Sequence, residues 1–224
     1  MNRTLITASI ASLLGLVCVS GCQRTVTAVE ESGDKHMEYK EYSAAVKDYE
    51  EYIDRRPGNA TVRAKLAEAY LAAGQTGMAA QQAQVAQAMR VEDDNVFAIT
   101  AKALYDDKRF EELNKLLRQR CIDRGRMPDY MLLASYSVKE GDLDEAQRAY
   151  LTAAKVDGGT SFEPHLALAQ LYGQIGDKKR ARERLGMAYY IAPNEPRVIQ
   201  AIRDAGEIPG PTFAIAPSEA TPAN

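Results

Sequence analysis

The sequence of 224 residues is poor in several residues that mark particular classes of protein. It has no tryptophan, three cysteines and two histidines, and clusters of β-branched residues are few. Ala, Leu, Glu, Gln, Arg and Lys are abundant instead, and these strong helix formers favour an all-α fold. The formal net charge is only −3, which argues against a protein that binds nucleic acid through bulk electrostatic attraction.

The sequence also lacks the residue patterns that carry catalysis. His36 and His165 have no cysteine or paired acids at ligand spacing, so no metal site is expected. There is no glycine-rich phosphate loop and no G-x-S-x-G nucleophile motif. We therefore expect a protein that is not an enzyme and that uses no cofactor, no metal and no small-molecule substrate.

An apolar stretch without charge lies near the N-terminus. It is "LITASIASLLGLVCV", Leu5–Val19, which follows Arg3. A membrane-spanning helix needs about 20 such residues, so this shorter run is typical of a signal peptide. The stretch "VSGC" that follows resembles the lipobox of bacterial lipoproteins, in which a cysteine after small residues is acylated and becomes the mature N-terminus. The resemblance implies a signal peptide over residues 1–21 and lipid attachment at Cys22.

Gln23, rather than an aspartate, follows this cysteine, and here the sequence resembles lipoproteins sorted to the outer membrane. The resemblance implies a bacterial cell-envelope protein, anchored by lipid in the outer membrane rather than the inner one, with its body in the periplasm. An ordinary signal peptide that happens to contain a cysteine remains the alternative. Cleavage would also remove Cys18, and Cys121 would then be the only free thiol, expected as a small buried residue on a helix.

A short pattern of small residues recurs along the rest of the chain. Its equivalent positions are Ala45, Ala79, Leu113, Ala146 and Ala181, separated by steps of 34, 34, 33 and 35 residues. Gly74, Gly141 and Gly176 precede the pattern at a constant distance in three copies. A period of this length is typical of stacked helix pairs, and the small residues predict where two helix axes pack closest.

These features resemble the tetratricopeptide repeat. The second copy has Leu66, Ala67, Tyr70, Gly74 and Ala79, and the fifth has Leu168, Ala169, Tyr172, Gly176, Ala181 and Pro193. The third copy is the most degenerate, with Lys108 in place of the glycine. The resemblance implies an all-α, right-handed superhelical solenoid of about five helix-turn-helix repeats plus a C-terminal capping helix.

The expected domain organisation follows from these patterns. It consists of a signal peptide (1–21), a tether (22–27), five repeats (28–195), a capping helix (196–206) and a disordered Pro-rich tail (207–224). The capping helix is expected because Val198, Ile199 and Ile202 share one face and could cover the last apolar edge of a solenoid. The tail has four prolines in 18 residues and no basic residue, a composition typical of disorder.

The family resemblance also implies a binding surface, because first helices of tetratricopeptide repeats line a concave groove that takes peptides or partner helices. The predicted groove residues are Leu71, Lys102, Tyr105, Met131, Val138, Leu166 and Gln170. The apolar ones could instead serve only to pack neighbouring helices, and the sequence leaves both possibilities open. Two basic runs, 115–126 and 178–184, fall on second helices. They are expected to be a solvated outer face, although contact with anionic lipid or an acidic partner is the alternative.

Taken together, these patterns predict a non-enzymatic adaptor with protein partners. The resemblance to repeat lipoproteins implies a role in an envelope assembly such as pilus biogenesis, outer-membrane protein assembly or secretion. The alternative is a structural or regulatory lipoprotein that binds or localises an envelope enzyme. Both hypotheses share the membrane anchor at Cys22 and exclude nucleic acid as a partner.

Overall fold

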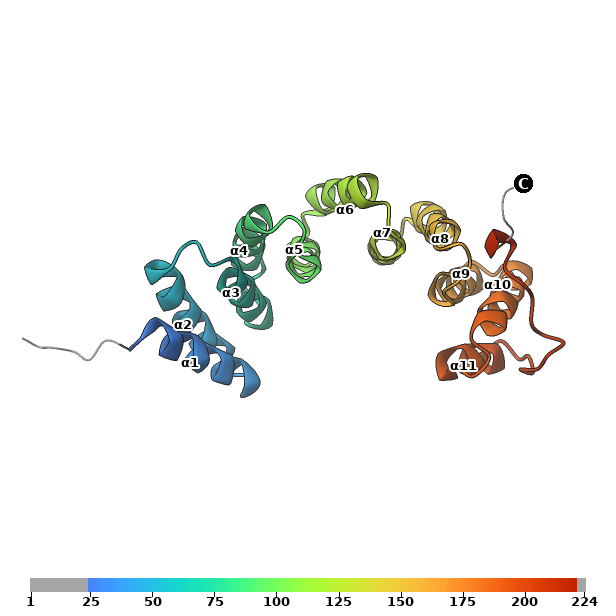
Figure 1. The fold of residues 1–224 in the computed structure, drawn as a ribbon, viewed down its shortest axis with the longest axis horizontal. Coiled ribbons are helices and arrows are strands. Elements are labelled where there is room, and N and C mark those ends of the chain that lie inside the picture. Colours follow the sequence, from blue (N-terminus) through green and yellow to red (C-terminus); the bar gives the residue numbers. More distant parts are fainter. Residues whose placement is uncertain (1–23, 221–224) are drawn as a thin grey trace, which may run out of the picture.

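The computed structural model describes residues 24–220, which form eleven α-helices, one short 3-10 helix and no strand (Figure 1). The α-helices are α1 (Val26–Glu38), α2 (Tyr42–Arg55), α3 (Ala60–Ala72), α4 (Thr76–Met89), α5 (Asp94–Asp106), α6 (Phe110–Arg124), α7 (Met127–Glu140), α8 (Leu143–Asp157), α9 (Glu163–Gln174), α10 (Lys178–Ile191) and α11 (Pro196–Asp204). The 3-10 helix is η1 (Ser218–Ala220). No helix in this part of the chain is long and apolar enough to cross a bilayer.

The helices form consecutive pairs that stack into a curved array (Figure 1). Between α3 and α9 the odd-numbered helices lie on the inner side of the curve, and α4, α6 and α8 lie on the outer side. Each pair packs against the next one along the chain, and α11 packs against α10 as a cap. The predicted fold, an all-α superhelical array of five helix pairs plus a capping helix, is confirmed.

The turns inside the pairs share one backbone geometry. Gly74, Gly141 and Gly176 end first helices with φ values of 76°, 83° and 80°. Lys40 and Lys108 occupy the same place in the first and third pairs, and each has φ 61°. A left-handed residue closes a helix well, but a side chain there costs energy that glycine avoids. The repeat therefore keeps the turn even where the sequence does not supply glycine.

Small residues lie between the two helices of a pair, as the periodic pattern predicts. Ala67, Ala79, Ala134 and Ala146 have no exposed surface. Gly33 takes the corresponding place in α1, where an added Cβ would lie 2.6 Å from the ring of Tyr49. Such close approach leaves room for nothing larger, because protein interiors are packed to nearly crystalline density.

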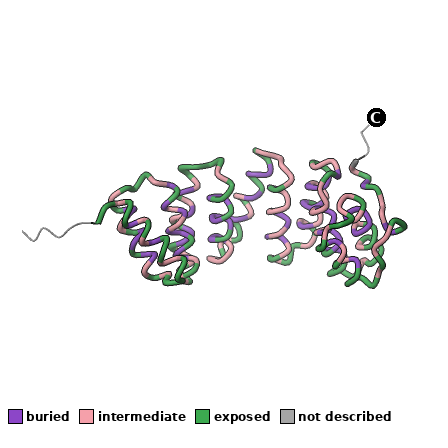
Figure 2. The backbone as a smooth tube through the Cα atoms, turned by 60° about the horizontal axis from the view of Figure 1, so that its bottom comes forward, coloured by how far each residue is buried: buried purple, intermediate pink, exposed green. Residues whose placement is uncertain are grey.

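The hydrophobic core follows the array instead of forming one centre. Buried positions occur in every helix pair along its whole length (Figure 2). One cluster of buried side chains extends from α1 to α9. A second cluster lies at the C-terminal end and consists of Leu166, Ala169, Leu185, Ala188, Val198, Ile202 and Phe213. Stability of this kind is a sum of contacts between neighbouring repeats.

The segment after α11 differs from the prediction. Disorder was expected over residues 207–224, but residues 207–220 pack against α10. Phe213 is only 3% exposed, and Arg184 Nη1 lies 2.7 Å from a carboxylate oxygen of Glu219. The prediction of disorder is wrong for this segment, because its few apolar residues pack against side chains of α10. The predicted lipid attachment site, Cys22, lies outside the described residues.

Candidate partner-binding surfaces

The seven predicted groove residues all lie on inner helices. Leu71 is on α3, Lys102 and Tyr105 are on α5, Met131 and Val138 are on α7, and Leu166 and Gln170 are on α9. These helices line the concave side of the array (Figure 1). The structure therefore puts the predicted residues on one face, but it gathers only three of them into one depression.

That inner depression lies between α7, α9 and α11 and has a volume of about 690 Å³. Met131, Leu166 and Gln170 line it on one side. The remaining lining residues are Glu163, Ala167, Pro196, Arg197, Gln200, Ala201 and Asp204. Leu166 is only 7% exposed and belongs to the C-terminal cluster, so it contributes an edge to the surface. The capping helix α11 forms the opposite wall, which the sequence analysis did not assign to the groove.

Tyr105 lies in an aromatic cluster at the end of its helix. Its ring centroid is 5.4 Å from that of Tyr136 and 5.7 Å from that of Phe110. Lys139 Nζ lies 4.4 Å from the centroid of Tyr136 and 5.3 Å from that of Tyr105. Burial raises the pKa of Tyr136 to about 12. Tyr105 thus has packing partners within the chain and is half-buried.

Leu71 and Val138 are also partly buried and pack against the main core cluster. For these two residues, packing between neighbouring helices accounts for their apolar character. Lys102 is exposed, and its Nζ pairs with Asp106 one turn later on the same helix. An exposed pair of this kind contributes little to stability and leaves Lys102 free to exchange partners.

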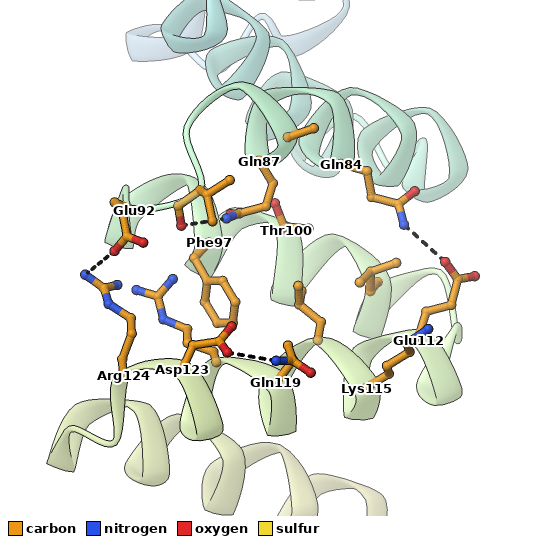
Figure 3. A pocket seen from close by; sticks show the side chains of 15 residues that line it. Gln84, Gln87, Glu92, Phe97, Thr100, Glu112, Lys115, Gln119, Asp123 and Arg124 are labelled. Carbon is orange, nitrogen blue, oxygen red and sulfur yellow. Dashed lines mark hydrogen bonds and ion pairs between the residues drawn. The ribbon is translucent and has the colours of Figure 1, made fainter.

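A second surface, on the outer side between α4 and α6, was not anticipated from the sequence. It is a groove of about 540 Å³ (Figure 3). Its apolar lining consists of Ala88, Val91, Phe97, Leu104 and Leu116; Phe97, Leu104 and the nearby Thr100 are buried, whereas Val91 is exposed. We call this the outer groove. Pockets of this volume with apolar lining and a few polar groups are typical of binding sites.

The rim of the outer groove is polar and mostly paired. Gln84 Nε2 donates to Glu112 across the groove at 3.1 Å, and Arg124 lies 3.2 Å from Glu92 (Figure 3). Gln87 Nε2 donates to the carbonyl of Val91 at 3.0 Å. Its Oε1 is buried and has no hydrogen-bond donor among the described residues. An occupant with an N–H or O–H group would satisfy this acceptor.

The outer groove exists because α5 and α6 are splayed apart, so that α6 crosses the view of Figure 1 while α5 is seen end on. Arg120 stands in α6 where the second, fourth and fifth repeats have Ala86, Ala153 and Ala188 and the first has Tyr52. Its guanidinium carbon lies 3.8 Å from the ring centroid of Phe97. Its side chain lies between α6 and the first turns of α5, and Leu113 takes the place of the alanine at the closest approach of this pair. The break in the alanine pattern was the available signal.

Arg120 also anchors a network of charges between the third and fourth pairs. Its Nε donates to Asp129 at 2.8 Å, its Nη2 donates to Asp94, and Arg126 donates to Asp129 at 2.9 Å. Arg120 is 7% exposed and Asp129 is 4% exposed. The expectation of a solvated basic face is wrong for Arg120. Burial alone would raise the pKa of Asp129, but the bonds from Arg126 and Arg120 hold it below its usual range.

Comparison with known families agrees with this architecture. Residues 36–103 match the family model described as Tetratricopeptide repeat. Solved structures with the same arrangement of helix pairs cover about four fifths of the chain. The fold is a tetratricopeptide-repeat solenoid. No curated protein sequence matches the chain.

Three solved tetratricopeptide-like structures illustrate the similarity. MamA is 16% identical, with a TM-score of 0.58 over 80% of this chain and 94% of its own. TTC0263, a thermophilic protein from Thermus thermophilus, is 18% identical, with a TM-score of 0.53 over 81% and 98%. YrrB, described as a tetratricopeptide-repeat protein with an unusual peptide-binding site, is 16% identical, with a TM-score of 0.52 over 80% and 92%. At these identities the similarity establishes the fold.

Tetratricopeptide-repeat folds are typically non-catalytic scaffolds that mediate interactions between proteins. In this solenoid two surfaces have the shape for that purpose, the inner depression and the outer groove. The inner depression combines apolar and polar side chains from three helices, whereas the outer groove has an apolar lining between α4 and the splayed third pair.

Proposed function

We propose that the protein is a membrane-anchored adaptor of the bacterial envelope that binds a protein segment on the concave face of its solenoid. The observation that carries the binding site is the inner depression, where α7, α9 and α11 converge. Met131 and Leu166 offer apolar contact there, and Gln170 is exposed beside them for hydrogen bonding to a partner backbone. Such a mixture suits an extended or helical segment that is apolar on one side.

The anchor rests on the N-terminal sequence. A lipobox-like "VSGC" follows an apolar run of signal-peptide length, and α1 begins at Val26, only a few residues after Cys22. Two or three acyl chains, at about 0.8 kcal/mol for each buried methylene, anchor a protein stably where one chain does not. The proposed location is the outer membrane with the repeats in the periplasm, and the proposed setting is an envelope assembly such as pilus biogenesis, outer-membrane protein assembly or secretion.

The anchor is tested by fractionation of cells that express Cys22→Ser. We expect this variant to leave the membrane fraction or to keep its signal peptide uncleaved. Labelling with an alkyne fatty acid should modify the unaltered protein and not the variant. Unchanged membrane association together with unchanged size would refute lipid attachment at Cys22.

The binding surface is tested by photocrosslinking in cells. A photoreactive residue at Gln170, in the inner depression, should give a discrete crosslinked product, and the same residue at Arg203, exposed near the end of α11, serves as the control. Met131→Asp should remove the product at position 170, while Met78→Asp, a change of the same type on α4 at a side chain that is 40% exposed, should leave it.

The outer groove is a second candidate surface, favoured by its apolar lining and by the unsatisfied Gln87 Oε1. A photoreactive residue at Lys115 on its rim distinguishes the two surfaces. Crosslinking from position 115 and none from position 170 would move the partner from the concave face to the outer groove.

A further inference from the structure

The segment that follows the capping helix is bound to α10 as a peptide would be. After Gly206, whose φ is 78°, residues 207–220 leave α11 and run along α10 toward the end of the chain (Figure 1). Four contacts hold this C-terminal segment: one apolar, one through the backbone and two ionic, of which the pair of Arg182 with Glu207 at 2.9 Å is the more exposed. Each contact involves a residue of α9, α10 or α11 that does not belong to the tetratricopeptide-repeat pattern.

The apolar contact is the side chain of Phe213. It is 3% exposed and lies in the C-terminal cluster with Leu185, Val198 and Ile202. The ring of Tyr189 meets it edge-on at 6.4 Å between centroids, and the Arg182 guanidinium lies 5.1 Å from its centroid. The ring of Phe213 thus lies between aliphatic side chains, an aromatic edge and a cation. Such a site favours an aromatic side chain over an aliphatic one.

The backbone contact depends on Gly186 in the middle of α10. Ile215 N donates to the carbonyl of Gly186 at 3.1 Å. A Cβ at position 186 would lie 2.8 Å from the carbonyl oxygen of Phe213 and 2.8 Å from the side chain of Ile215. Glycine is unfavourable inside a helix, so its presence here is explained by the close approach of another backbone.

The more buried of the two ionic contacts is a seat for a carboxylate. Arg184 Nη1 lies 2.7 Å from Glu219 Oε1, and the two side chains are only 14% and 12% exposed. The same nitrogen lies 3.1 Å from Nδ1 of His165, which has no exposed surface. Burial keeps His165 neutral by lowering its pKa, so Nδ1 can accept from the guanidinium. His165 thereby fixes the arginine that receives the carboxylate.

We propose that this face of α10 is a second binding site, specific for an extended segment with an aromatic residue and a carboxylate six residues later, and that the C-terminal segment occupies it until a partner segment of that chemistry displaces it. The spacing is that of Phe213 and Glu219. The site is distinct from the inner depression and the outer groove.

The C-terminal segment has features that allow it to dissociate from α10. The connection from α11 includes Pro209, Gly210 and Pro211, and Ile208 within it is 84% exposed. Between the segment and α10 the described residues form a single backbone hydrogen bond, from Ile215. A segment tethered this closely competes at an effective concentration in the millimolar range. It therefore lowers the apparent affinity of any partner by the fraction of time for which the site is free.

The test uses the full chain and a fluorescein-labelled peptide with the sequence of residues 207–220 as the probe. In the double variant Phe213→Ser/Glu219→Lys the chain's own segment can no longer fill the two seats. We expect fluorescence anisotropy to show at least tenfold tighter binding of the probe to this variant than to the unaltered chain. Ile208→Ala is the matched control, because Ile208 is apolar but exposed, and it should bind the probe as weakly as the unaltered chain does.

Specificity is tested in the double-variant background. Adding Gly186→Val should abolish binding of the probe, whereas Gly173→Val, on α9 where an added Cβ meets nothing within 4 Å, should not. A probe with alanine at the phenylalanine position should also fail. Equal binding to the double variant and the unaltered chain, or binding to neither, would show that the C-terminal segment is a fixed part of the cap.

A second measurement covers the case in which the double variant does not fold. Hydrogen exchange of residues 207–220 is followed in the unaltered chain with and without excess unlabelled probe synthesised with heavy isotopes, so that its mass is distinguishable. We expect exchange of the chain's own segment, Ile215 included, to become at least tenfold faster when the probe takes its place. Exchange that the probe leaves unchanged would overturn displacement.

Discussion

Arg120 offers the most direct test of how the third repeat is held together. In Arg120→Met the side chain keeps most of its length and its contact with Phe97, but it loses its bonds to Asp129 and Asp94. Asp129 is 4% exposed, so its carboxylate would stay buried with Arg126 as its remaining cationic partner.

The size of the effect follows from these contacts. Breaking a buried ion pair by removing one partner costs about 3–5 kcal/mol, because the other charge stays buried. Since Arg126 remains 2.9 Å from Asp129, we place Arg120→Met at the low end, about 3 kcal/mol. Loss of the cation over Phe97 adds about 1 kcal/mol. A loss of this size is a large part of the total stability of a domain, which is about 5–15 kcal/mol.

The assay is urea denaturation followed by far-ultraviolet circular dichroism. Arg118→Met is the matched control, since Arg118 is on the same helix and its side chain is 56% exposed. It should change stability by at most about 0.5 kcal/mol. The double variant Arg120→Met/Asp129→Leu removes both charges and should recover most of the loss, because no buried charge is left unpaired. A double variant as unstable as Arg120→Met alone would refute the electrostatic argument and assign the loss to packing.

Three further predictions are tested by denaturation, the first two with urea and the third with heat. Lys108→Gly should stabilise the chain by about 1 kcal/mol, because φ 61° penalises a side chain, while Lys108→Ala should not stabilise it. Gly33→Ala should lower the free energy of unfolding by about 1–3 kcal/mol, because its Cβ would meet the ring of Tyr49. Gly173→Ala, in open space within a helix, should raise that free energy by about 1 kcal/mol. Equal effects of the two variants would contradict the contact with Tyr49. The pKa of Asp129 is held below its ordinary value of about 4. The stability that this carboxylate contributes is therefore present above about pH 4 and is lost as the pH falls through the lower pKa of the folded state. Asp129→Asn should accordingly flatten the acid side of a plot of melting temperature against pH.

The helical array was predictable because each repeat has the same local requirement. Alanine at positions such as 79 and 146 can lie between close helix axes, and glycine at 74 and 141 can adopt the left-handed turn. These requirements involve residues near in sequence, so a periodic pattern records them. Cys121 was expected to be a small buried residue on a helix, because free cysteine is usually buried. It is 5% exposed, and burial raises its pKa to about 11.

The features that the sequence did not reveal depend on single contacts between distant residues. Disorder of the C-terminal segment was inferred from its proline content, but Phe213 and Glu219 are ordered by a glycine and an arginine on α10. The amino-acid composition describes the segment as a whole, so it does not indicate that two of its residues are anchored by contacts with α10. In the third repeat, Arg120 looked like one more member of a basic run. Only its replacement of the usual alanine, together with the position of Asp129, distinguishes it from a solvated charge.

The groove residues were predictable as a face but not as a site. Periodicity places Leu71, Tyr105 and Val138 on inner helices, and the structure shows that they also meet neighbours in the core. The wall formed by α11 depends on how far the capping helix turns, which no repeat pattern encodes. The depression that includes Met131 and Gln170 depends on how α7, α9 and α11 converge in three dimensions.

The splayed third pair gives the solenoid one mechanically soft point. Elsewhere, bending the array would pull apart interlocked small side chains, and close packing resists such strain. Between α5 and α6 the buried side chains of Leu104, Leu113 and Leu117 are supplemented by the ion pairs of Arg120 beside an open groove. The side chain of Asp94 is 62% exposed, so salt screens its bonds with Arg124 and Arg126 over about 8 Å at physiological ionic strength, whereas the buried pair of Arg120 and Asp129 is screened much less. The curvature of the whole array, and with it the distance between its two ends, should therefore respond to ionic strength through this one repeat.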